Sequence, residues 1–334
     1  MTPVRLRDEE TPAPTHGRGK PRPRLRVKLI FSLALTFLVL LFVLLYVLDH
    51  LEEFRAILSR DISVSSILGV CVSIALLYLF NGQILRQAQR VHSLDLPFWE
   101  NLALTYATSA INYYLPLKGA MGLRAYYLKT QFKLPVTDFL SQITLIGLIS
   151  LCLSSFFALI GLLQMGVQGR LGTILCLYFL AVCLLGTSLI FVAKLPFKLP
   201  KFLTGPLNSW DSFRQNPRTL ISIVCLDILY YLMWCLGHWF SLRSFNIHLN
   251  LWETLFYAGG QIHSLLINLT PAGLGVMEAF SVFAGQILNF SPAEALLAQG
   301  LNRFSAICVL GVLGTISWGY LLYLKRKKSK NLDS

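Results

Sequence analysis

The chain has 334 residues, of which 55% are hydrophobic and only 13% are charged, with a mean hydropathy of +0.61. This composition excludes a soluble globular domain and is typical of a polytopic helical membrane protein. The formal net charge is +13: eight Lys or Arg precede residue 29, and five follow Tyr323. Basic segments that flank membrane spans follow the positive-inside rule, so we expect cytoplasmic termini and no nucleic-acid partner.

In chain order, residues 1–27 combine several prolines with charges and predict a disordered basic tail. Apolar runs long enough for a span of about 20 residues follow. They lie near 29–48, 67–86, 139–165, 172–193, 219–242 and 304–324, and a second basic tail covers 325–334. We expect one all-α transmembrane domain over 28–324, with no soluble catalytic domain beside it.

Two further apolar regions, 98–130 and 252–290, are each interrupted by Pro and Gly. If each held one full span, the Lys- and Arg-rich loop 194–218 would lie outside the cell. If each is instead a re-entrant hairpin, that loop and both termini lie inside. The charge bias of short loops therefore predicts two broken hairpins.

The hairpins divide the chain into halves of about 28–165 and 172–324, the second inverted relative to the first. Matching residues open and interrupt the two broken regions. They are Trp99-Glu100 and Trp252-Glu253 at the starts, and Asn112 with Pro116 and Asn268 with Pro271 before the breaks. Inverted repeats with broken helices are an alternating-access architecture of transporters.

The first break runs from Asn112 through Pro116 and Lys118 to Arg124. Pro removes a backbone donor, so a half-helix should end here. Lys118 and Arg124 are then candidates for binding an anionic lipid phosphate, which Arg contacts with two donors. The alternative is that both are loop cations that extend to the membrane interface.

The second break contains Gly273 and Gly275, which permit a tight turn or leave amide groups near a half-helix start that attract anions. Glu278 then either caps that half-helix or has a gating role. Arg303, expected at the start of the last span, either pairs with Glu278 or anchors the span at the interface.

Three polar residues within apolar runs are secondary candidates. Asp227 should face the bundle interior and is a candidate for proton coupling, while Gln261 and His263 most simply form interhelical hydrogen bonds. The seven cysteines lie in apolar runs without metal-ligand spacing. We therefore expect no metal and no cofactor.

Residues 270–278, Thr-Pro-Ala-Gly-Leu-Gly-Val-Met-Glu, together with Leu301-Asn302-Arg303, resemble the signature of the lysylphosphatidylglycerol synthase transmembrane family. The first break resembles the family's Leu-Pro-Gly-Arg-x-Gly-Glu-x-x-Arg stretch, with Ala120 and Met121 where Gly and Glu are usual. The resemblance covers roughly 28–324. It implies a stand-alone relative of the flippase domain of the multiple peptide resistance factor, without an aminoacyl-transferase domain.

The function expected from this resemblance is translocation of a lipid or a lipid-linked headgroup across a bacterial-type inner membrane. The substrate would be an anionic phospholipid or a polyprenyl-phosphate-linked molecule. The alternatives are an integral-membrane transferase that acts on a lipid carrier, or a non-catalytic partner of such a synthase or transferase. The transferase reading relies on Glu278 and Asp227, the best deep carboxylates that the sequence offers it.

Overall fold

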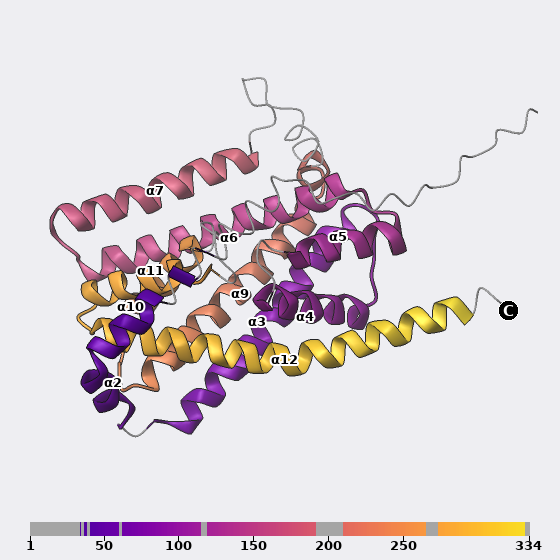
Figure 1. Cartoon of the computed structure of the whole chain (residues 1–334). Helices are drawn as coiled ribbons and strands as arrows, with labels where there is room; N and C mark the ends of the chain where they lie inside the picture. The colour runs from indigo at the N-terminus through magenta and orange to yellow at the C-terminus, as the bar shows by residue number, and fades with distance from the viewer. Residues whose placement is uncertain are drawn as a thin grey trace, which may run out of the picture.

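The computed structural model describes residues 34, 37–38, 41–59, 62–114, 119–191, 210–264 and 273–330, and the regular elements in these segments are all helices (Figure 1). Their bounds are α2 Leu51–Leu58, α3 Val64–Arg90, α4 Phe98–Tyr114, α5 Gly119–Phe132, α6 Val136–Met165, α7 Gly169–Phe191, α9 Pro217–Arg243, α10 Leu251–Ser264, α11 Val276–Ile287 and α12 Pro292–Lys330. Within the described part, α3, α6, α7, α9 and α12 are long and apolar enough to cross a membrane. The chain is therefore an all-α polytopic membrane protein. The predicted span 29–48 lies mostly outside the described residues.

Both broken regions form helical hairpins that enter and leave at one end of the bundle. Helices α4 and α5 have 17 and 14 residues, or about 25 and 21 Å at 1.5 Å per residue, which is short of the hydrocarbon core of about 30 Å. Leu96 precedes α4 and Leu134 follows α5, and the two side chains belong to one buried cluster. The first broken region is thus a helical hairpin with short arms and with its two ends together, which is consistent with the re-entrant prediction.

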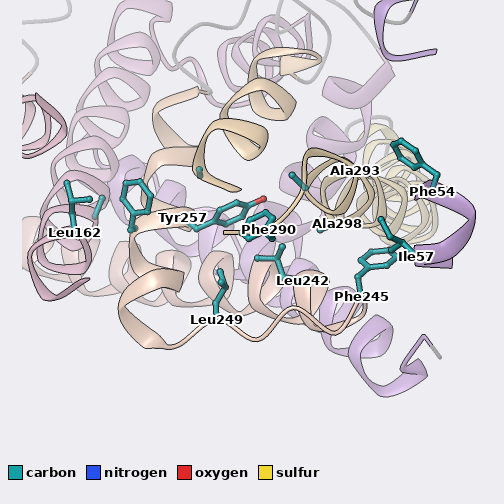
Figure 2. Packing of buried hydrophobic residues seen from close by; sticks show 14 of the residues in the cluster. Phe54, Ile57, Leu162, Leu242, Phe245, Leu249, Tyr257, Phe290, Ala293 and Ala298 are labelled. Atoms are coloured by element: carbon teal, nitrogen blue, oxygen red, sulfur yellow. The ribbon is translucent and has the colours of Figure 1, made fainter. Parts of the chain in front are cut away.

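The second hairpin closes in the same way at its own end. Helices α10 and α11 have 14 and 12 residues. Leu249 before α10 and Phe290 after α11 lie in the same buried cluster, to which Leu242 of α9 and Phe54 of α2 also contribute (Figure 2). A chain that returned on the far side of the membrane would not bring these residues together.

The long helices α3 and α9 pack antiparallel at the centre of the bundle (Figure 1). Gly69 near the start of α3 faces Phe240 near the end of α9, and Ser73, one turn further along α3, faces Gly237, one turn earlier in α9. Around this pair, α4 packs along α12 and α10 packs along α6. Each hairpin therefore packs against the last span of the other half, as an inverted repeat predicts.

Small residues allow these crossings to be close. A Cβ atom on Gly161 of α6 would overlap the carbonyl oxygen of Trp252 at the start of α10, and one on Gly314 of α12 would lie 2.6 Å from the Cβ of Ala110 in α4. Close backbone approach through Gly is a common means of packing helices in a membrane, where the hydrophobic effect provides little drive between helices.

The last helix differs from its predicted bounds. It begins at Pro292 rather than 304 and continues to Lys330, beyond the boundary predicted at 324 (Figure 1). Its start is set by reciprocal capping, in which Ser291 N donates to Glu294 Oε2 at 3.0 Å and Glu294 N donates to Ser291 Oγ at 3.2 Å. Arg303 therefore lies three turns inside α12, and the prediction that it starts the span is wrong.

Candidate functional site

A cavity of about 330 Å³ lies beside the first hairpin, with walls from α3, α4, α5, α6, α9 and α10. Three residues singled out in the sequence, Asn112, Arg124 and Asp227, line it. Ile262, near the end of α10, also lines it, so the first arms of the two hairpins approach each other here. Pro116, Lys118, Asn268 and Pro271 lie outside the described residues.

Arg124 is 4% exposed, and neutral groups hold its guanidinium. Nη1 donates to Thr105 Oγ1 at 3.1 Å, and Nη2 donates to Asn101 Oδ1 at 3.0 Å. Nε has no hydrogen-bond partner, and no carboxylate among the described residues forms an ion pair with this side chain. A buried cation without a counter-charge is costly, so an anion that entered the cavity would be bound strongly. The alternative that Arg124 is an interfacial loop cation is wrong.

The groups that hold Arg124 are themselves fixed. Asn101 Nδ2 donates to the carbonyl of Gly82 in α3 at 2.7 Å, and Thr105 Oγ1 donates to the carbonyl of Asn101 at 2.9 Å. Asn101 and Thr105 are four residues apart, so they lie on one face of α4. The sequence analysis missed both, although polar residues at helical spacing in an apolar helix were a usable signal.

Asp227 is 2% exposed and accepts a hydrogen bond from Ser150 Oγ of α6 at 2.8 Å. The prediction that it faces the bundle interior is confirmed. It lines the same cavity as Arg124, but the two form no ion pair. The cavity therefore carries one cationic and one acidic side chain, each held by neutral partners.

Glu278 and Arg303 form the ion pair predicted as one alternative. Arg303 Nε donates to Glu278 Oε1 at 2.5 Å and Nη2 donates to Oε2 at 3.1 Å, and the two side chains are 15% and 12% exposed in the order Arg303 and Glu278. This two-donor geometry is the strong form of an Arg–carboxylate contact. Neither side chain is among those that line the large cavity.

Glu278 also caps its own helix, because its Oε2 accepts the amide of Gly275 at 2.7 Å. Gly273 and Gly275 have φ of 67° and 88°, a region that favours glycine. The cap on α11 and the ion pair with Arg303 are thus present together. The Gly275 amide is not free for an external anion, because the carboxylate of Glu278 already occupies that helix start.

Gln261 and His263 form interhelical hydrogen bonds, as predicted. Gln261 Nε2 lies 2.5 Å from Ser281 Oγ of α11. His263 bonds Ser155 Oγ of α6 at 3.0 Å through Nε2 and Tyr178 OH of α7 at 2.8 Å through Nδ1. These contacts tie α10 to three other helices, and the sequence offered no local signal for Ser155 or Tyr178.

A family model described as the lysylphosphatidylglycerol synthase TM region matches residues 27–314. The chain belongs to this family. The match covers nearly all of the predicted transmembrane domain, and the family's name relates it to membrane phospholipid metabolism. No curated protein matches the chain.

For this lysylphosphatidylglycerol synthase TM protein, the departures noted in the first motif fall at the cavity. Ala120 and Met121 both line it, about one turn before Arg124 in α5. The wall is therefore apolar at 121, and among the described residues no carboxylate pairs with Arg124. Among the described residues, no group of three His, Cys, Asp or Glu side chains could hold a metal.

Proposed function

We propose that this protein binds the phosphate of an anionic phospholipid, or of a polyprenyl-phosphate-linked lipid, at Arg124 and carries the headgroup across the membrane. The observation that supports it is the buried Arg124 guanidinium, which lines the cavity with a free Nε and, among the described residues, no carboxylate partner. Arg presents several donors in a fixed plane that matches phosphate geometry.

The architecture supports transport rather than catalysis. Two halves of inverse order, each with a broken hairpin, are the arrangement that transporters use to open a central site to either side in turn. The transferase alternative requires acid and base groups at one site. Asp227 lines the cavity but Glu278 does not, since it is bound to Arg303 and the Gly275 amide. We therefore propose a non-enzymatic carrier.

The proposal is tested with purified protein in liposomes that contain fluorescent phosphatidylglycerol. A membrane-impermeant quencher is added outside, and the rate at which label from the inner leaflet becomes accessible to it is followed. Wild type should accelerate exchange. Arg124→Ala should slow it by about tenfold or more, since hydrogen bonds to a charged group contribute about 1.5–3 kcal/mol. Arg124→Lys keeps the charge but loses the planar donors, so its rate should be intermediate.

The matched control is Arg218→Ala, which removes one positive charge from an exposed position at the start of α9. It should exchange lipid at the wild-type rate. Full activity of both Arg124→Ala and Arg124→Lys would refute the proposed site, and a wild-type protein that moves no lipid would refute transport itself.

We further propose an inner-membrane location with cytoplasmic termini. Arg86 and Arg90 lie at the end of α3, at the end of the bundle where the first hairpin enters. Arg214, before α9, lies at the same end, because Trp210 Nε1 donates to the carbonyl of Ser141 near the start of α6. By the positive-inside rule this basic end faces the cytoplasm. A cysteine at Ser212 should react with an impermeant maleimide only after cell lysis, whereas one at Gln168, in the α6–α7 turn, should react in intact cells. The reverse pattern would invert the topology.

A further inference from the structure

The two halves can be aligned by counting from their helix starts. Glu278 is the third residue of α11, and Met121 is the third residue of α5. Arg303 is the twelfth residue of α12, and Gly147 is the twelfth of α6. The Trp-Glu pairs at the starts of α4 and α10 support the same alignment. Met121 and Gly147 therefore occupy the positions equivalent to the ion pair.

These two equivalent positions are where the cavity lies. Met121 and Gly147 both line it, and a Cβ atom built on Gly147 would meet nothing within 4 Å. In the second half, the corresponding space between the hairpin and the last span is filled by the side chains of Glu278 and Arg303. The cavity in the first half thus lies where the second half has the Glu278–Arg303 ion pair, and the equivalent positions 121 and 147 carry no charge.

The charge that remains there is positive. Arg124 lies three residues after Met121 on α5, so the two side chains are neighbours on one face of the helix. A carboxylate at 121 would lie beside Arg124, but the chain supplies none. Asp227, the other charged residue on the wall, is bonded to Ser150 and not to Arg124.

We propose that the phosphate of the lipid substrate takes the place of this missing carboxylate, between Met121 and Gly147, with Arg124 as its counter-charge. The proposal rests on the proposed function and adds to it the position of the anion and the reason that the position is vacant. Met121 is then a specificity-determining residue, because an acidic side chain there would compete with the ligand. Gly147 leaves this space open, and a long side chain at that position would enter it.

The experiment compares Met121→Glu with Met121→Gln in the full-length protein. Binding of short-chain phosphatidylglycerol is measured in detergent by fluorescence, with inorganic phosphate as competitor, together with the thermal midpoint. Met121→Gln, which matches Glu in size but carries no charge, controls for the change of shape at the site. Met121→Glu should bind at least about tenfold more weakly than Met121→Gln, because it places a like charge beside the phosphate. Its thermal midpoint without ligand should exceed that of the Gln variant, because the new carboxylate pairs with Arg124.

The outcomes separate this inference from the proposed function. Wild-type binding by Met121→Glu, or equal loss in Met121→Gln, would overturn the position of the anion, while a defect in Arg124→Ala would still support the proposed function. Absence of binding by wild type would refute the proposed function itself. Competition by inorganic phosphate would show that the phosphate group suffices, and lack of competition that the lipid chains are needed. In both cases the inference holds only if Met121→Glu loses at least about tenfold more binding than Met121→Gln.

Discussion

The two hairpins have the same arrangement of helices but differ in the partners of their charged side chains. In the second, Glu278 neutralises Arg303 and caps α11, so the half-helix is tied to the last span from within the chain. In the first, Arg124 has only neutral partners and faces a cavity, and α5 makes few contacts with α6. One repeat is closed by its own residues, and the other leaves space and charge for a ligand. Two halves of similar design can therefore serve as a support and a binding site.

The largest effect should come from breaking the closed half. Glu278→Gln keeps an oxygen that can accept the Gly275 amide, so its effect reports loss of the ion pair rather than of the cap. We expect Glu278→Gln and Arg303→Met each to destabilise the protein by about 3 kcal/mol, because each removes the opposite charge from one member of a largely buried ion pair. Thermal unfolding in detergent measures this. The double variant should be more stable than either single variant, and simple additivity of the two losses would disprove coupling.

A smaller difference in stability is expected between substitutions on the packed face and on the open face of one helix, α6. A Cβ atom on Gly161 would overlap the Trp252 carbonyl and lie 2.9 Å from Phe256 N, whereas one on Gly147 meets nothing within 4 Å. Gly161→Ala should therefore cost about 1–3 kcal/mol through overpacking. Gly147→Ala should be neutral or stabilising by up to about 1 kcal/mol, because Ala favours helix over Gly. Equal thermal midpoints for the two variants would contradict the difference between the faces.

The smallest change in stability should follow removal of the charge in the open half. Arg124→Met leaves no carboxylate without a partner, and it deprives only Asn101 and Thr105 of a donor, at about 1 kcal/mol each. Removing an uncompensated buried cation offsets part of that loss. The thermal midpoint should thus stay close to wild type while lipid exchange is lost. A loss of stability as large as that of Arg303→Met would show that Arg124 is a structural residue.

Much of the fold could be predicted because its signals are local. Hydropathy marked the long spans, and Pro and Gly marked the breaks near 115 and 270. The positive charges of the 194–218 loop favoured hairpins over full spans for the two broken regions. The start of α12 was misplaced by twelve residues because Pro292 through Arg303 contains Glu294, Gln299 and Arg303, which lower its hydropathy, while the Ser291–Glu294 cap that starts the helix was not recognised.

The candidate site could be predicted only in part. Arg124, Glu278 and Arg303 were found because charges are rare in apolar runs and because the family motif includes them. Asn101 and Thr105 were missed although their helical spacing was a usable signal, and Ser150 and Ser155 were missed because a lone hydroxyl in a helix gives no sign of its partner. Burial, not residue type, makes these groups important.

By itself, the sequence determined the class of the protein, the order of its spans and the positions of its two breaks, since each depends on composition within a few helical turns. The tertiary structure decided which charges meet. Glu278 and Arg303 are 25 residues apart and form an ion pair, while Arg124 and Asp227 line one cavity without pairing. Helix crossings, which residues such as Gly161 and Gly314 allow to be close, determine these distances, and no local pattern encodes them.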